Sequence, residues 1–111
     1  MPAPNWRSLL FVPVTAEKFV ARAHTRGADV IILDLEDSIP PDGKDAARAA
    51  LPAAARQVRG GGVEVCVRIN RPLELAIPDI QAAVMPEVTA LMLPKAMGAQ
   101  HVRLLEEVVA A

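Results

Sequence analysis

Four runs of hydrophobic residues divide the chain, and each is followed by polar or turn-forming positions. The runs begin near positions 8, 30, 63 and 90, and they are rich in Val, Ile and Leu. Short, uninterrupted apolar runs of this kind are typical of strands that are buried on both faces of a parallel sheet. The pattern therefore predicts four strands, and the second of them leads into Asp34-Leu-Glu-Asp37.

Helical periodicity fills the intervals between the predicted strands. After the first strand, Thr15 is a candidate N-cap and Gly27 a candidate C-cap for a helix with an apolar stripe at Ala16, Phe19, Val20 and Ala23. Asp42 is a candidate cap for a second helix, whose stripe is Ala47, Ala50, Leu51, Ala54 and Val58. Pro52 lies within that helix, so we expect a kink or two short helical pieces.

The second half of the chain repeats this alternation. The strand 63–69 places its valines and Ile69 on one side and Glu64, Cys66 and Arg68 on the other, so the valine side is expected to meet helices. A short helix is expected around 79–84, after a loop that contains two prolines. The fourth strand is expected over 90–95, and a last helix from about Ala99 carries an apolar stripe with His101, Leu104, Leu105 and Val108.

Four β-α units of roughly thirty residues each predict an α/β fold with a parallel sheet and right-handed crossovers. Two architectures fit this order: an open, doubly wound sheet or part of a (β/α)8 barrel. Barrels typically need about 250 residues, so the length of 111 residues favours the open sheet.

The residues at the strand ends favour the barrel. Asp34, Glu36 and Asp37 follow the second strand, Arg68 ends the third and Lys95 ends the fourth. Chemistry in parallel α/β folds is assembled at the carboxyl ends of the strands. The guanidinium fork of Arg68 suits a carboxylate, either that of a substrate or that of Glu36.

Composition narrows the functional classes. Twelve basic and thirteen acidic residues give a formal net charge of −1, and no basic run is present, which argues against binding to nucleic acid or to a membrane surface. The single Cys66 has no partner for an internal disulfide, which fits a reducing, cytoplasmic compartment. Cys66 is expected in the core, and His24 and His101 are expected on helices outside the chemistry.

Five motifs together resemble the HpcH/HpaI aldolase and citrate lyase β-subunit family of the phosphoenolpyruvate/pyruvate superfamily. They occur in order as Arg7-Ser-Leu-Leu-Phe-Val-Pro13, Val30-Ile-Ile-Leu-Asp-Leu-Glu-Asp37, Lys44 with Ala46-Ala-Arg48, Val67-Arg-Ile-Asn70 and Leu93-Pro-Lys95. The resemblance implies a (β/α)8 TIM barrel of which residues 1–111 form the amino-terminal half. It also implies an Mg²⁺-dependent carbon–carbon lyase acting on citryl-, citramalyl- or malyl-CoA-like acids.

The resemblance also assigns roles. It implies that Arg68 binds the carboxylate or keto-acid end of the substrate, and that Glu36 and Asp37 line the mouth as catalytic acids that hold Arg68 or metal-bound water. Arg7 and Lys44 are implied near the coenzyme A portion. The family's two Mg²⁺ ligands come from strands beyond the fourth, so they are expected outside this chain, and these 111 residues alone are expected to be inactive.

The turn after the first strand and the open edges of the sheet lead to two further expectations, and two alternative functions remain. Pro13 is followed by Val14, where the family often has Gly, so the thioester contact at that turn is expected to differ. The open edges of a half-barrel lead us to expect a homo-oligomer. The alternatives are a non-catalytic half-barrel used for assembly and a small open-sheet protein that binds a phosphate-bearing ligand.

Overall fold

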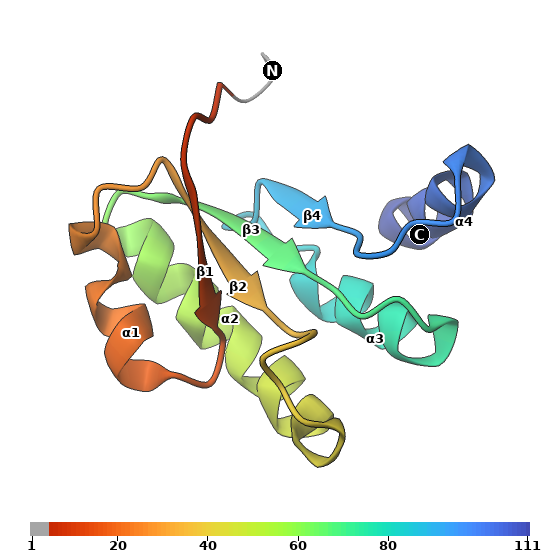
Figure 1. Ribbon diagram of the computed structural model, residues 1–111, viewed down its shortest axis with the longest axis horizontal. Helices are drawn as coiled ribbons and strands as arrows, with labels where there is room; N and C mark the ends of the chain where they lie inside the picture. The colour runs from red at the N-terminus through yellow and green to blue at the C-terminus, as the bar shows by residue number, and fades with distance from the viewer. Residues whose placement is uncertain (1–4) are drawn as a thin grey trace.

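A computed structural model describes residues 5–111, which form a four-stranded parallel sheet in the order β1-β2-β3-β4 (Figure 1). The strands are β1 (Leu9–Pro13), β2 (Val30–Asp34), β3 (Glu64–Arg68) and β4 (Ala90–Met92). All four expected strands are present and neighbours in sequence are neighbours in the sheet. The predicted parallel α/β fold class is confirmed.

A helix follows every strand, as the periodicity predicted. The helices are α1 (Glu17–Arg22), α2 (Lys44–Gly60), α3 (Leu73–Ala83) and α4 (Ala99–Ala110), with short 3-10 helices η1 (Ala23–Thr25) and η2 (Pro41–Gly43). No helix within residues 5–111 is long and apolar enough to cross a membrane. The order β-α therefore recurs four times along the described chain.

The helices cover one face of the sheet and form the main core there. Alternate strand positions, including Ile31, Leu33, Val65 and Val67, are fully buried against helical side chains. The helical contribution comes from Val20, Ala23, Ala47, Leu51, Ala54, Ala55, Val58, Ala76, Ile80, Ala83 and Leu105. Each Val, Leu or Ile buried in this way contributes about 1.5–3 kcal/mol. The prediction that the valine side of β3 meets helices is confirmed.

The opposite face of the sheet holds a smaller apolar cluster of Val30, Ile32 and Cys66. Trp6, Ala90 and Met92 pack against this cluster, and the indole N–H of Trp6 donates a hydrogen bond to the carboxylate of Glu64. Cys66 is 2% exposed, and burial raises the pKa of its thiol to about 11. The expected core position of Cys66 is confirmed, and its thiol stays protonated at neutral pH.

Two expectations about proline-containing segments need correction: α2 is one helix and not two pieces, and the helix expected around 79–84 starts earlier. Helix α2 runs without interruption through Pro52, and α3 begins at Leu73 and includes Pro78 instead of starting near Asp79. A proline removes one backbone hydrogen bond at a cost of about 3 kcal/mol. The buried apolar faces of the two helices offset that loss, since each helix buries several side chains, among them Leu51 and Val58 of α2 and Ile80 of α3.

The predicted N-caps of the first two helices were also wrong. Helix α1 begins after Ala16 and α2 after Gly43, and neither has a side-chain cap from Thr15 or Asp42. Phe19, expected on the buried stripe of α1, is 60% exposed, and Leu104 of α4 is 46% exposed. Strand β4 ends at Met92 because the chain turns there, with Lys95 in the left-handed region at φ 50°.

Candidate functional site

The buried carboxylate of Asp34 organises the loop that follows β2. Asp34 is 1% exposed, and its two oxygens accept hydrogen bonds from the backbone N–H groups of Glu36 and Ser38, both at 2.9 Å. An aspartate that bonds the backbone two residues ahead forms a local turn in place of a continued strand. The turn ends β2 and fixes the direction in which Glu36 leaves the sheet.

Asp34 also receives the fork of Arg68 from the neighbouring strand. Arg68 Nε lies 2.7 Å from Asp34 Oδ1, and Arg68 Nη2 lies 2.9 Å from Asp34 Oδ2. The two residues face each other in the β2–β3 register. Burial alone would raise the pKa of the Asp34 carboxyl, but hydrogen bonds from Arg68, Ser38 and Glu36 hold it well below its usual range.

Sequence reasoning assigned Asp34 no partner and offered Glu36 as the protein carboxylate for the fork of Arg68. The structure gives the fork to Asp34, while Glu36 Oε1 lies 3.5 Å from Arg68 Nε as an ion pair. Asp34 and Glu36 are two residues apart, so the two-residue period of a strand puts their side chains on one face. The pairing itself follows from the β2–β3 register, in which Asp34 lies opposite Arg68.

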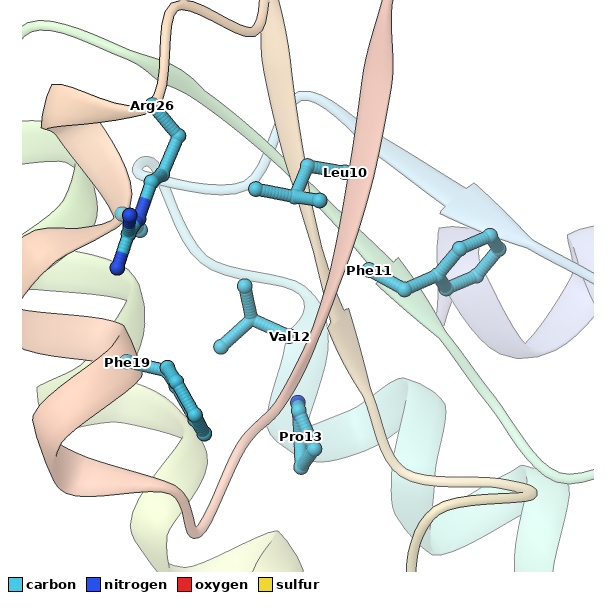
Figure 2. A pocket seen from close by; sticks show the side chains of 7 residues that line it. Leu10, Phe11, Val12, Pro13, Phe19 and Arg26 are labelled. Carbon is cyan, nitrogen blue, oxygen red and sulfur yellow. The ribbon is translucent and has the colours of Figure 1, made fainter.

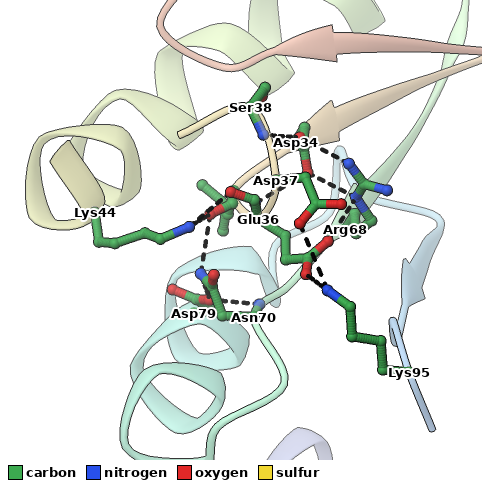
Figure 3. A network of polar contacts seen from close by, with 10 residues as sticks. Asp34, Glu36, Asp37, Ser38, Lys44, Arg68, Asn70, Asp79 and Lys95 are labelled. Atoms are coloured by element: carbon green, nitrogen blue, oxygen red, sulfur yellow. Dashed lines mark hydrogen bonds and ion pairs between the residues drawn. The ribbon is translucent and has the colours of Figure 1, made fainter. Parts of the chain in front are cut away.

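Glu36 links the ends of three strands (Figure 3). It is 8% exposed, and its Oε2 accepts a hydrogen bond of 2.6 Å from Lys95, which follows β4. Lys95 also lies 3.5 Å from the exposed Asp37, and the hydrogen bond to Glu36 raises the pKa of the Lys95 ammonium. Glu36, Asp37, Arg68 and Lys95 are therefore brought together, as the charged strand ends predicted.

Lys44 and Asn70 support the backbone beneath these charges. Lys44 Nζ donates to the carbonyl oxygens of Leu35 at 3.0 Å and Glu36 at 2.6 Å. The side-chain amide of Asn70 donates to the same Leu35 carbonyl at 2.9 Å and to Asp79 of α3 at 2.7 Å. The loop after β2 is thus held from α2, from the end of β3 and from α3.

Arg7 lies apart from this cluster. It precedes β1, and its backbone N–H donates to Asp29 at 2.6 Å, just before β2. In a parallel sheet, the amino ends of all strands lie at one end of the sheet and the carboxyl ends lie at the other. The resemblance assigned Arg7 and Lys44 to the same cofactor. In the structure, Arg7 lies at the amino ends of the strands and Lys44 lies at their carboxyl ends.

The described acids do not fit an Mg²⁺ site. Both oxygens of Asp34 already accept two hydrogen bonds each, and Glu36 faces two cationic side chains. Within residues 5–111, no group of three His, Cys, Asp or Glu side chains is arranged to hold a metal ion. The carboxylates of this cluster are instead engaged by Arg68 and Lys95 of the same chain.

An apolar groove of about 340 Å³, with Arg26 as its one charged lining residue, lies on the helix side of β1, away from the cluster around Glu36. Leu10, Val12 and Phe19 point into it, whereas the ring of Phe11 points to the other side of the strand (Figure 2). That ring lies 4.4 Å from Cζ of Arg68, measured to the ring centre. Phe11 thus belongs to the charged cluster, and sequence reasoning missed it because its contact crosses from β1 to β3.

The family match and the similar proteins of known activity all point to one family. Residues 7–111 match the family described as HpcH/HpaI aldolase/citrate lyase. The chain is 36% identical to citrate lyase subunit beta of Leuconostoc mesenteroides subsp. cremoris over 107 residues, which cover 93% of this chain and 34% of that protein. It is 34% identical to the mitochondrial citramalyl-CoA lyase of Mus musculus over 102 residues, covering 87% of this chain and 30% of that protein.

A solved structure shows the same arrangement of elements. CitE from Mycobacterium tuberculosis, in complex with magnesium, acetoacetate and coenzyme A, matches with a TM-score of 0.70 at 34% identity. The match covers 91% of this chain and 37% of that chain. The chain spans about a third of the length of the curated relatives that it matches.

Proposed function

Because the chain belongs to the HpcH/HpaI aldolase/citrate lyase family, we propose that it contributes four of the eight β/α units of a barrel that cleaves or forms a carbon–carbon bond. The proposed substrate is a citryl-, citramalyl- or malyl-CoA-like acid. Residues 1–111 are the amino-terminal part of that barrel in this proposal, and they are inactive without the remaining units. The relatives matched by the chain include both citrate lyase and citramalyl-CoA lyase, which supports the class of reaction.

The observation that carries the proposal is the charge cluster at the carboxyl ends of β2, β3 and β4. Arg68 and Lys95 approach the same carboxylate, Glu36, at 3.5 Å and 2.6 Å. Catalytic groups of (β/α)8 enzymes gather at this end of the strands. The arrangement provides fixed positive charge for a substrate carboxylate and for the negative charge that develops when a carbon–carbon bond breaks.

Each site residue predicted from the sequence has a place in this proposal. Arg68 binds the carboxylate or keto-acid end of the substrate, while Glu36 and Asp37 line the mouth and hold Arg68 and Lys95 in place. Lys44 supports the loop that carries Glu36 through two backbone carbonyls, and it approaches the coenzyme A portion from the start of α2. Arg7 would contact coenzyme A only if the cofactor extended to the amino ends of the strands.

Mg²⁺ is the proposed cofactor, since a related CitE structure contains magnesium together with acetoacetate and coenzyme A. When bound, Mg²⁺ supplies a Lewis acid for the keto-acid oxygens. Its ligands are proposed to lie outside this chain. A homo-oligomer in the cytoplasm, acting on an acyl-CoA or keto-acid substrate, completes the proposal.

A non-catalytic assembly role is the second candidate. Strand β1 has a neighbour on one side only within the described sheet, and its Leu9, Leu10 and Phe11 are 44%, 37% and 46% exposed. An apolar edge strand is a template for pairing with another chain. The half-barrel would then serve to join subunits, and the charge cluster would only stabilise its loops.

Turnover with Mg²⁺ separates the two candidates. Citryl-, citramalyl- and malyl-CoA are incubated with the longest expressible version of the protein over a titration of Mg²⁺, and the cleaved thioester is measured. We expect Mg²⁺-dependent cleavage of one of the three that Arg68→Ala abolishes and Arg56→Ala, on the exposed surface of α2, leaves unchanged. Absence of cleavage at every Mg²⁺ concentration would favour the assembly role.

A further inference from the structure

We propose that Asp34 and Phe11 are positioning residues that present one edge of the Arg68 guanidinium, the edge carrying Nη1 and Nη2, to a carboxylate of the ligand. Neither residue is assigned a role by the family resemblance. The ligand half of this inference rests on the proposed function, whereas the positioning half concerns only residues of this chain.

Asp34 fixes the orientation of the guanidinium plane. It occupies the Nε–Nη2 edge with two short hydrogen bonds, so Arg68 is unable to turn about its last bond without breaking both. Asp34 is itself immobile, because two backbone N–H groups hold its oxygens and it is 1% exposed. A rigid carboxylate therefore defines where the other edge of Arg68 points.

Phe11 covers one flat face of the same guanidinium. Its ring centre lies 4.4 Å from Cζ, a distance at which a cation is attracted to the aromatic face. The ring comes from the strand on the other side of β2, and it remains 46% exposed. Phe11 thus closes one approach to Arg68 and leaves an apolar wall beside the remaining edge.

One edge of Arg68 stays available after these contacts. Within the part of the chain that the structure describes, Nη1 makes no hydrogen bond, and Nη2 uses one of its two hydrogens on Asp34. The remaining N–H groups on Nη1 and Nη2 point in parallel, which is the geometry that accepts a carboxylate in a bidentate pair. Glu36 lies on the Nε side and does not block this edge.

The side chain of Arg68 is 19% exposed, so the free edge reaches solvent at the mouth of the sheet. A small 2-oxo or 3-oxo acid fits this arrangement: its carboxylate would pair with Nη1 and Nη2, and its carbon chain would lie against Phe11. The pair Asp34–Phe11 would then set the angle at which the acid enters, without touching its reacting atoms.

Nuclear magnetic resonance of the ¹⁵N-labelled 111-residue chain tests the two halves separately. The Nε–H of Arg68 reports its order, and a titration with acetoacetate reports binding. We expect slow solvent exchange of this Nε–H in the wild type and fast exchange in Asp34→Asn. Acetoacetate binding should weaken about tenfold in Asp34→Asn and about threefold in Phe11→Leu.

Matched variants serve as controls. Phe11→Tyr keeps the aromatic ring, so, unlike Phe11→Leu, it should bind acetoacetate as tightly as the wild type does. Asp45→Asn removes an exposed carboxylate, and Phe19→Leu removes an exposed ring on the other side of β1; both should bind acetoacetate as the wild type does. Phe11→Leu keeps an apolar side chain, so it provides a test even where Asp34→Asn fails to fold.

The outcomes divide cleanly. An Arg68 Nε–H that exchanges in the wild type as fast as that of exposed Arg59 overturns the positioning roles, whatever ligand binds. Measurable acetoacetate binding of equal affinity in wild type, Asp34→Asn and Phe11→Leu overturns them as well. An ordered Arg68 in a chain that binds no acetoacetate supports the positioning roles and overturns the assigned ligand, which counts against the proposed function instead.

Discussion

Asp79 receives two hydrogen bonds from Asn70, one from its backbone N–H at 2.9 Å and one from its side-chain amide at 2.7 Å. Both residues are buried, and the other oxygen of Asp79 accepts a hydrogen bond of 2.9 Å from Arg48 of α2. One carboxylate thus ties the end of β3 to two helices. Through Asn70 it also reaches the carbonyl of Leu35, one residue before Glu36.

Asp79→Asn is therefore expected to destabilise the fold. The substitution removes the charge that accepts three hydrogen bonds, and hydrogen bonds to charged groups contribute about 1.5–3 kcal/mol each in favourable cases. We expect a loss of about 2–3 kcal/mol in the free energy of unfolding by urea. Asp45→Asn is the matched control: it contacts the same Arg48 but is exposed, so its loss should stay within about 0.5 kcal/mol. Equal losses would contradict the role given to Asp79.

The acid sensitivity of the fold should depend on Asp34. Its pKa in the folded chain lies below the value of about 3.9 in an unfolded chain. The unfolded state therefore binds more protons in this range, and the stabilisation is present above about pH 5 and lost as the pH falls toward the folded pKa.

The measurement is urea unfolding at pH 7 and at pH 3.5. Asp34→Asn should cost about 3 kcal/mol at pH 7, as expected when one partner of a buried ion pair is removed, and clearly less at pH 3.5. Ser38→Ala should give an intermediate pH dependence, since Ser38 contributes hydrogen bonds to the same carboxylate. A constant difference between wild type and Asp34→Asn at both pH values would contradict the prediction.

The sheet was predictable from the sequence because its strands are determined by local composition. Val30 to Leu33 form an apolar run that is typical of a strand buried on both faces, and all four of these residues are fully buried. The helix boundaries were not predictable to the same degree. Pro52 and Pro78 are poor helix residues locally, but contacts from elsewhere in the chain hold the helices around them.

The candidate site was predictable only in outline. Charged residues at three strand ends indicated that Glu36, Arg68 and Lys95 would meet, and they do. The partner of Arg68 required the register between β2 and β3, which no local pattern contains. The contributions of Phe11 and Asp79 come from residues 57 and 9 positions away from their partners Arg68 and Asn70, so they emerge only in the folded chain.

Arg68→Lys should impair catalysis in a version of the protein that turns over substrate. Lysine keeps the charge but loses the fork, so it is unable to bind Asp34 and a substrate carboxylate in bidentate fashion at once. We expect kcat/KM to fall by an amount equivalent to about 1.5–3 kcal/mol, the value of a charged hydrogen bond. Steady-state kinetics decides the point, and an unchanged kcat/KM in a folded variant would remove Arg68 from the proposed site.

Glu36→Gln should weaken Mg²⁺-dependent turnover and leave the fold intact. The neutral amide no longer holds Lys95 and Arg68 electrostatically, but Asp34 still anchors Arg68. Turnover per folded molecule, measured beside circular dichroism, separates the two effects. Glu107→Gln on the exposed face of α4 is the control. Loss of folding with full activity per folded molecule would show that Glu36 is only structural.

The 111-residue chain should associate through the edges of its sheet. Within the described sheet, β1 and β4 each have one neighbour, which leaves a row of backbone donors and acceptors free on the outer side. Closure of a barrel solves this problem by pairing every strand. The isolated chain has two ways to satisfy these groups: a second copy, or the remaining units of a barrel.

Sedimentation at micromolar concentration tests this expectation, with two lysine substitutions as a matched pair. Leu9 on the β1 edge and Leu73 on α3 are 44% and 46% exposed, so they lose similar apolar surface when each is replaced by Lys. A charge on an edge strand opposes pairing, whereas the same charge on a helix surface does not. Leu9→Lys should therefore shift the wild-type oligomer toward monomer, and Leu73→Lys should not. A compact wild-type monomer that unfolds cooperatively would contradict this prediction and show that the open edges need no partner.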